Sequence, residues 1–210
     1  MVYNGVAEGF KPLPPERIRE IREEFSEGDP YFIFVGSIHP RKNIINLLKA
    51  FDLFRLRTSY PMNLLIVGKK QWCSSSIEET HRKMKYQKDV IFTGRLDVDK
   101  LQQVVASAFA LTYVSLFEGF GIPLLEAMKC NVPVITSNIT SMPEVAGDAA
   151  LFVDPYRPDE IAQAMEQLAT NEQLRKELIR KGAVRCENFS WELSANLLWQ
   201  SIMKTIHQTQ

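Results

Sequence analysis

Two glutamates flank a glycine-containing segment near the middle of the chain. Glu118 and Glu126 stand on either side of Gly119, Gly121 and Pro123. An apolar run precedes Glu118 and "PLLEAMK" follows the glycines, which predicts a strand-to-helix turn. Glycine permits unusual backbone angles and lets a ligand approach the main chain closely. The unpaired N–H groups and partial positive charge at the start of the helix favour a phosphate or diphosphate there.

The two carboxylates suit different parts of a ligand that carries phosphates. Glu126 lies about one turn into the expected helix, where it can accept two hydrogen bonds from a vicinal diol such as ribose, each worth roughly 1.5–3 kcal/mol. Glu118 lies at the strand end, facing whatever is attached to the phosphates. The same pattern fits a purely structural role, with a glutamate complementing the helix dipole beside a tight connection. No dinucleotide-binding or P-loop glycine motif occurs, so spacing alone leaves both interpretations open.

Six short apolar runs indicate the strands that position this turn. They show little strict alternation, which is typical of parallel strands buried on both faces. They span residues 31–38, 62–68, 90–96, 110–117, 133–138 and 150–155. Segments with helical spacing, such as "NIINLLKAFDLFRLR" and "DEIAQAMEQLA", alternate with them. We therefore expect an α/β fold, a Rossmann-like doubly wound parallel sheet of about six strands, with the ligand beyond the carboxyl ends of the strands.

Composition excludes several classes of function. The 210 residues carry 25 Lys plus Arg and 25 Asp plus Glu, so a large basic face for nucleic acid is not expected. Three scattered cysteines, Cys73, Cys130 and Cys186, are typical of reduced thiols in a cytosolic protein rather than of a metal site. The chain start lacks the apolar core of a signal peptide, and no apolar run approaches the roughly 18 residues of a membrane span.

A longer stretch around the glutamates carries a family resemblance. "SLFEGFGIPLLEAMKCNVPVITSNITSMPEVAGDAALFVDP", together with "YFIFVGSIHPRKNIINLLKAF", "VIFTGRL" and "YNGVAEGF", resembles the C-terminal, donor-binding domain of family 4 (group 1) glycosyltransferases, which are retaining enzymes of the GT-B fold. The resemblance covers essentially the whole chain, as the C-terminal half of that fold. It implies an inter-domain linker at 1–16, a nucleotide-sugar-binding Rossmann-like domain at 17–188, and a C-terminal helix at 189–210 that packs towards an N-terminal domain.

The resemblance also implies a role for each matching residue. Glu126 would bind the ribose hydroxyls, Glu118 would lie beside the donor sugar and the reacting centre, and Lys42 would steady the diphosphate leaving group. Glu118 and Lys42 are the residues expected to act in catalysis. The full donor-binding set is Gly36, Ser37, Arg41, Lys42, Gly94, Arg95, Glu118, Gly119, Phe120, Gly121, Ile122 and Glu126. Many family members carry an arginine at the position of Ser37, and Arg41 is the candidate for that second positive charge.

The activity implied by the resemblance is that of a retaining hexosyltransferase. A sugar would pass from a nucleotide-diphosphate sugar to a glycan or lipid-linked acceptor held by the N-terminal domain, with no metal or cofactor and no nucleic-acid partner. The form of the loop after the first strand in this chain, "GSIHPRKN", resembles that of mannosyl or related transferases of polysaccharide and lipopolysaccharide synthesis. We expect a cytoplasmic enzyme without a transmembrane segment, with peripheral contact at the inner membrane face left open. This chain alone is expected to bind the donor and transfer little.

Alternatives remain for both residues and function. "DVD" at 97–99 resembles a D-x-D metal motif but also suits a helix N-cap. His39 is a candidate general base or an ordinary loop histidine, and Lys69 and Lys70 are candidates for substrate contact or for solvated surface. A GT-B-like nucleotide-sugar epimerase or phosphorylase, and a non-enzymatic nucleotide- or sugar-binding module, are the competing functions.

Overall fold

A computed structural model of the chain describes residues 2–69 and 75–208. Within them a six-stranded parallel sheet forms from all six of the expected apolar runs. The strands are β1 (Tyr31–Val35), β2 (Asn63–Val67), β3 (Val90–Gly94), β4 (Ala110–Tyr113), β5 (Val134–Ser137) and β6 (Ala150–Val153). Each ends before its apolar run does, because the last residues of the run already belong to the loop at the carboxyl edge.

The strand order is β3-β2-β1-β4-β5-β6. The chain builds outward from β1 to β3 and then returns to place β4 on the other side of β1. Phe32 of β1 is accordingly in register with Leu64 of β2 and with Ala110 of β4. The order therefore reverses between β1 and β4, and the loops that leave these two strands emerge side by side, at the place where such sheets bind ligands.

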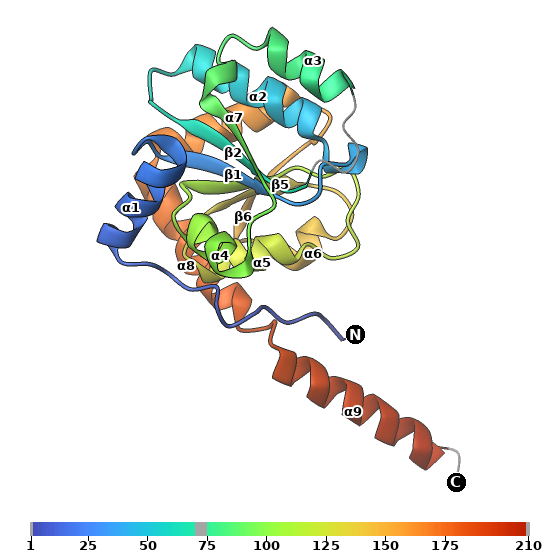
Figure 1. The fold of residues 1–210 in the computed structure, drawn as a ribbon. Helices are drawn as coiled ribbons and strands as arrows, with labels where there is room; N and C mark the ends of the chain where they lie inside the picture. Colours follow the sequence, from blue (N-terminus) through green and yellow to red (C-terminus); the bar gives the residue numbers. More distant parts are fainter. Residues whose placement is uncertain (1, 70–74, 209–210) are drawn as a thin grey trace.

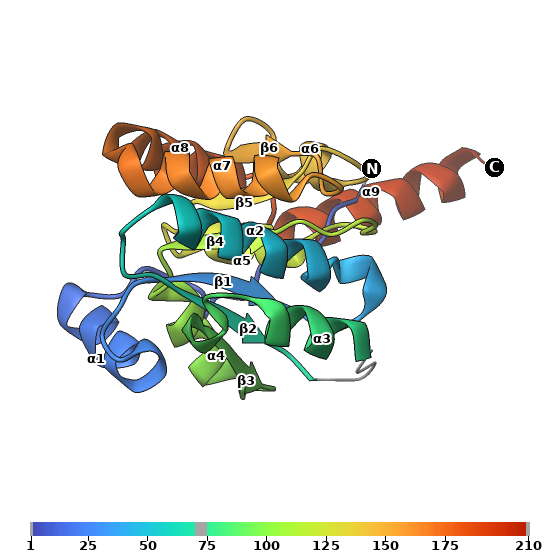
Figure 2. The ribbon, with the colours of Figure 1, turned by 90° about the horizontal axis from the view of Figure 1, so that it is seen from above.

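Helices cover both faces of the sheet, with α2, α3 and α7 on one side and α4, α5 and α6 on the other (Figures 1 and 2). The helices are α1 (Pro15–Ser26), α2 (Ile44–Arg57), α3 (Ser75–Lys83), α4 (Val98–Ala106), α5 (Ile122–Lys129), α6 (Met142–Ala146), α7 (Pro158–Thr170), α8 (Glu172–Cys186) and α9 (Trp191–Gln208), with short 3-10 turns η1 (Pro40–Lys42) and η2 (Gln87–Asp89). The doubly wound α/β architecture is the one expected.

The amphipathic patterns explain which helix faces are buried. The α2 stripe that includes Leu47, Phe51 and Phe54 is fully buried, and every residue of β1 is buried, as a strand covered on both faces requires. Asp97 caps α4, because its carboxylate accepts the Lys100 N–H at 2.8 Å. The helix-cap interpretation of the 97–99 motif is thereby confirmed for Asp97.

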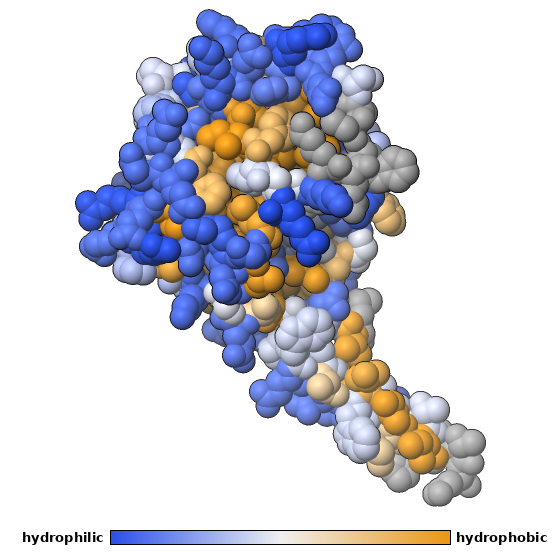
Figure 3. Space-filling view, in the orientation of Figure 1, coloured by the Kyte–Doolittle hydropathy of each residue, from blue (hydrophilic) through white to orange (hydrophobic). Residues whose placement is uncertain are grey.

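Helix α9 extends away from the body of the protein (Figure 1). It begins after Ser190, whose Oγ accepts the Leu193 N–H at 3.1 Å, as expected for an N-cap. An apolar stripe runs along it (Figure 3), and Trp191, Leu198, Trp199, Ile202 and Ile206 are all exposed. In the described part of the chain, no helix is both long enough and apolar enough to cross a membrane.

Candidate functional site

Hydrogen bonds lock the loop after β1 against the loop after β4. The Leu116 N–H donates to the Arg41 carbonyl at 2.8 Å. The side-chain amide of Asn43 donates to the carbonyls of Val114, at 3.0 Å, and Pro155, at 2.7 Å. Asn43 has a positive φ of 61° and joins η1 to α2, so the loop turns sharply there. These contacts bring the two basic residues of η1 beside Glu118 at the carboxyl edge.

Glu118 sits between the two cations. Its Oε1 lies 2.5 Å from Lys42 Nζ and its Oε2 lies 2.9 Å from Arg41 Nη1. Lys42 is 6% and Glu118 9% exposed, so the pair is almost enclosed by protein. Burial alone would raise the pKa of Glu118, but the hydrogen bonds and charges of Lys42 and Arg41 hold that pKa below its ordinary value. Glu118 is therefore an ionised hydrogen-bond acceptor rather than a proton donor.

Tyr113, the last residue of β4, completes the cluster and was not expected from the sequence. Its hydroxyl accepts from Lys42 Nζ and donates to Glu118 Oε1 at 3.1 Å. The ring stacks on Phe34 of β1 with centroids 5.7 Å apart. Burial raises the pKa of Tyr113, so the phenol stays protonated. The available signal was its place at the end of a strand beside the reversal point, where polar side chains face the ligand edge.

Arg41 and Lys42 keep N–H donors that no group of the described residues accepts. An ammonium has three N–H donors and a guanidinium five. Lys42 donates two of its three N–H groups, one to the Tyr113 hydroxyl and one to Glu118 Oε1. Arg41 uses Nη1, which also donates to the Phe117 carbonyl at 3.2 Å, and its side chain is 43% exposed. Nε and Nη2 of Arg41 have no partner within the described residues. With one carboxylate against two cations, the cluster has a net positive charge that favours an anion.

The turn between Glu118 and α5 offers further donors. Within residues 2–69 and 75–208, none of the main-chain N–H groups of residues 119–122 donates to a protein acceptor. The carbonyls of Glu118 and Phe120 lie 3.0 and 2.9 Å from the hydroxyl of Ser141, which fixes the backbone of the turn from the other side. The unused N–H groups stand at the N-terminus of α5, which is an arrangement suited to binding phosphate oxygens.

The two glycines of the turn have different reasons to be glycine. Gly121 has a φ of 112°, and a Cβ there would meet Met142 Cε at 2.6 Å, so the fold itself requires it. Gly119 has an ordinary φ, and a Cβ there would meet no heavy atom of the described chain within 4 Å. The packing of the described residues therefore does not explain glycine at 119, whereas close approach of a ligand to the backbone would.

Glu126 contrasts with Glu118. It is the fifth residue of α5 and half-buried, and its carboxylate has no hydrogen bond or ion pair among the described residues. Burial raises the pKa of Glu126 to about 7. A carboxylate in this setting is stabilised by any ligand that donates hydrogen bonds to it.

The remaining predicted donor contacts lie along the same edge of the sheet. Gly36 follows β1, and a Cβ there would lie 3.7 Å from Lys42 Nζ; Ser37 comes next and is half-buried. Gly94, with a φ of 73°, is the last residue of β3, and the exposed Arg95 follows it; β3 is separated from β1 by β2. The structure thus gathers Arg41, Lys42 and Glu118 into one cluster, while Gly94 and Arg95 lie at the far end of the edge.

Other candidate residues have local roles or lie elsewhere. His39 accepts the Arg41 N–H on Nδ1 at 3.2 Å and so shapes η1. Lys69 is exposed after β2, and Lys70 and Cys73 lie outside the described residues. No group of three or more potential metal ligands occurs among the residues described.

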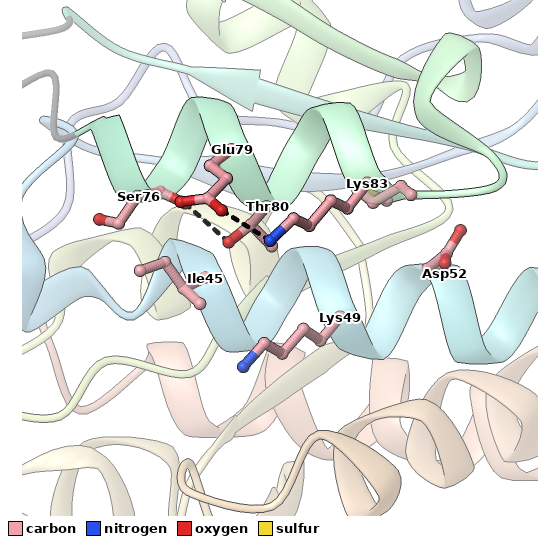
Figure 4. Close-up of a pocket in the computed structure, with 8 residues that line it drawn as sticks. Ile45, Lys49, Asp52, Ser76, Glu79, Thr80 and Lys83 are labelled. Atoms are coloured by element: carbon pink, nitrogen blue, oxygen red, sulfur yellow. Dashed lines mark hydrogen bonds and ion pairs between the residues drawn. The ribbon is translucent and has the colours of Figure 1, made fainter.

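One open cavity lies away from the cluster. It holds about 460 Å³ between α2 and α3 and is lined by Lys49, Asp52, Glu79 and Lys83 among others (Figure 4). Glu79 and Lys83 pair with each other there at 2.6 Å. None of the residues expected to bind the donor lines this cavity.

Comparisons with known proteins identify the family of this chain. The family described as "Glycosyl transferases group 1" matches residues 16–185. The O-antigen chain mannosyltransferase B of Escherichia coli is 35% identical over 162 residues, which are 77% of this chain and 42% of that protein. The chain therefore spans less than half the length of this curated relative.

Solved structures reproduce the fold. Anabaena HepE, solved in complex with UDP-glucose, matches 97% of the chain and 57% of its own length with a TM-score of 0.86 at 16% identity. The C-terminal domain of a group 1 glycosyl transferase from Francisella tularensis, LpcC, matches 86% of the chain and 95% of that structure, with a TM-score of 0.75 at 22% identity. The fold is thus the C-terminal half of a GT-B fold, as expected.

Proposed function

The chain belongs to the group 1 glycosyl transferases, and on that premise we propose that it is the donor-binding half of a retaining hexosyltransferase. The observation that carries the proposal is the cluster at the carboxyl ends of β1 and β4. There Arg41, Lys42 and the unused N–H groups of residues 119–122 converge beside a strand-order reversal. Such an arrangement suits a nucleoside diphosphate that departs from the anomeric carbon of a sugar.

In this proposal the protein acts mainly on the leaving group. As the bond to the sugar breaks, negative charge grows on the diphosphate, and fixed donors that stabilise this charge lower the barrier. Lys42 and Arg41 supply the positive charge. Glu118 holds both cations in place, and because both of its oxygens are already engaged we assign it to orientation of the cations and of sugar hydroxyls, not to nucleophilic attack.

Glu126 is proposed to bind the ribose. Its half-buried, unpartnered carboxylate lies one turn beyond the diphosphate donors, a separation that suits a ribose next to a diphosphate. The Gly94–Arg95 segment is proposed to lie near the base. We propose no metal and no cofactor, because two cations and a helix N-terminus are available to offset the charge of the diphosphate.

Mannose is the proposed donor sugar and a growing glycan the proposed acceptor. Relatives from Escherichia coli named as an O-antigen chain mannosyltransferase and as a serotype-specific mannosyltransferase support this choice, since they match 77% and 100% of this chain. We further propose that the apolar face of α9 packs against the acceptor-binding half of the enzyme, in agreement with its exposed Trp191, Trp199 and Ile202. The proposed location is cytoplasmic, with the acceptor reached at the inner face of the membrane.

The test is calorimetry with nucleoside diphosphates and with the corresponding nucleosides. Lys42→Ala should weaken the diphosphate by tenfold or more and the nucleoside little, because only the diphosphate contacts the ammonium. Lys49→Ala on the exposed side of α2 is the matched control and should change neither affinity. Equal losses of diphosphate and nucleoside affinity in Lys42→Ala would remove the diphosphate contact from the proposal.

A further inference from the structure

Three aromatic rings from distant parts of the sequence meet at the back of the glycine turn. Tyr3 belongs to the lead-in segment (residues 2–10), Phe120 to the turn, and Phe189 to the connection between α8 and α9. The ring centroids are 6.0 Å apart for Tyr3 and Phe120, 5.4 Å for Tyr3 and Phe189, and 5.8 Å for Phe120 and Phe189. Phe120 is therefore held by two residues from outside the nucleotide-binding loops.

Tyr3 reaches the turn by a second route. Its hydroxyl donates to Glu144 Oε1 at 2.7 Å, and Glu144 belongs to α6. The residue that precedes α6, Ser141, is the one whose hydroxyl lies 3.0 and 2.9 Å from the carbonyls of Glu118 and Phe120. The Tyr3 side chain thus contacts the turn directly through Phe120. It also contacts α6, the helix whose N-cap residue, Ser141, fixes the backbone of the turn.

The other side of Tyr3 is tied to α9. Ser194, in the first turn of α9, donates from Oγ to the Tyr3 carbonyl. Arg185 lies over the Phe189 ring at 5.0 Å and donates from Nε to the Val145 carbonyl of α6 at 3.0 Å. The lead-in segment, α6 and the start of α9 consequently form one packed unit behind the glycine turn.

We propose that Tyr3 is a positioning residue for the glycine turn. Its side chain couples the main-chain N–H groups of residues 119–122 to the lead-in segment and to the first turn of α9. The inference rests on the proposed function for the identity of the ligand. Its physical basis is that the turn has no hydrogen bonds from its own N–H groups within the described chain, so its conformation depends on Phe120 and Ser141. Loss of the Tyr3 side chain removes the ring that packs against Phe120. It also removes the hydrogen bond to Glu144 of α6, the helix that follows Ser141.

The coupling is reciprocal. If the contacts of Tyr3 favour the turn conformation that binds a diphosphate, a bound diphosphate must favour the contacts of Tyr3 by the same factor. Nucleoside diphosphate should therefore slow backbone hydrogen exchange in residues 2–6 and 189–194, although the proposed ligand contacts neither segment. This protection should exceed the protection that the ligand gives to the rest of the domain by stabilising the folded state, which is all that is expected if Tyr3 only stabilises the fold.

The test compares Tyr3→Ala and Tyr3→Phe with wild-type chain, using UDP and GDP, each beside its nucleoside. Tyr3→Ala should weaken the bound diphosphate about threefold to tenfold and leave the nucleoside nearly unchanged, and it should abolish the ligand-dependent protection at 189–194. Tyr3→Phe keeps the ring and should recover most of the affinity. Tyr60→Ala, at an exposed tyrosine in the loop before β2, is the control and should behave as wild type.

Two results would overturn the inference while leaving the proposed function intact. One is diphosphate affinity and exchange protection in Tyr3→Ala equal to those of wild type. The other is an equal loss for diphosphate and nucleoside that Tyr3→Phe does not recover. If Tyr3→Ala does not fold, Tyr3→Leu keeps the bulk without ring or hydroxyl and must show the same diphosphate-specific loss. Wild-type chain that binds neither UDP nor GDP would overturn the proposed function for these bases, and with it this inference.

Discussion

Replacing Glu126 by glutamine should stabilise the protein and weaken its binding of nucleotides at the same time. The pKa of this half-buried carboxyl is about 7 in the folded chain, against an ordinary value of 4.5. Below pH 4.5 it is protonated in both the folded and the unfolded chain and has no effect on stability. As the pH rises the unfolded chain ionises first, so the folded state loses stability progressively until the pH exceeds the folded-state pKa.

The size of this loss follows from the two pKa values. At about 1.4 kcal/mol for each pH unit between 4.5 and about 7, the folded state loses up to about 3 kcal/mol by pH 8. Glutamine has nearly the same shape but no charge to desolvate. Urea unfolding should therefore find Glu126→Gln more stable than wild type by about 2–3 kcal/mol at pH 8 and by less than 1 kcal/mol at pH 5. Glu187→Gln, at an exposed glutamate, is the control and should show no such pH-dependent gain.

Binding supplies the second half of this prediction. Loss of a charge-assisted hydrogen bond, at about 1.5 kcal/mol, corresponds to roughly tenfold weaker binding. Because Glu126 is assigned to the ribose, nucleoside and nucleoside diphosphate should lose affinity alike in calorimetry. Wild-type affinity for the nucleoside should also rise with pH between 6 and 8, as the carboxylate ionises, and Glu126→Gln should lack this rise. A variant that gains stability at pH 8 yet binds nucleoside as tightly as wild type would refute the ribose assignment.

Three further predictions concern the cluster and the turn. Gly119→Ala should keep the melting temperature within a few degrees of wild type, because a Cβ there meets no described atom within 4 Å. It should nevertheless weaken the binding of nucleoside diphosphate at least tenfold in calorimetry. Unchanged binding would mean that no ligand approaches the turn. Tyr113→Phe removes the hydroxyl between Lys42 and Glu118. Because Lys42 loses an acceptor, the variant should bind diphosphate several-fold more weakly and be less stable by about 1 kcal/mol in urea unfolding. Unchanged binding and unchanged stability would contradict a positioning role. Glu118→Gln leaves the nearly buried Lys42 without its counter-charge and should cost about 3 kcal/mol at pH 7. Its effect should shrink as the pH falls, because the wild-type carboxylate, whose pKa is held below its ordinary value, is then protonated as well; a loss that persists undiminished in acid would argue against the ion pair as its source.

The sequence predicted the sheet well because buried parallel strands have a strong local signal. Each of the six apolar runs became a strand. The strand ends were placed too late by up to four residues, as at 110–117, where β4 ends at Tyr113. The residues that follow are apolar because they pack under the loops of the site, and composition alone cannot distinguish that burial from burial within a strand. Helix α1, which follows the proline-rich lead-in, was not among the helices expected from periodicity.

The candidate site was predictable in its residue types and less so in its contacts. Family resemblance selected Lys42 and Glu118, but their hydrogen bond depends on β1 and β4 lying side by side, which is a property of strand order. Tyr113 was missed for the same reason, since its partner Lys42 belongs to a loop about seventy residues away in sequence. The meeting of Tyr3, Phe120 and Phe189 likewise joins segments that no local pattern connects. Arg41, predicted to supply the positive charge that many family members carry at the position of Ser37, forms an ion pair with Glu118.

We propose above all that this chain binds a nucleoside diphosphate through the diphosphate and the ribose of that ligand. The most direct measurement is calorimetric titration of the wild-type chain with UDP, GDP and ADP, each compared with its nucleoside. We expect at least one diphosphate to bind, and to bind at least tenfold more tightly than its nucleoside, because Arg41, Lys42 and the turn contact only the phosphates. Absence of binding by all three diphosphates, or equal affinity for a diphosphate and its nucleoside, would contradict it.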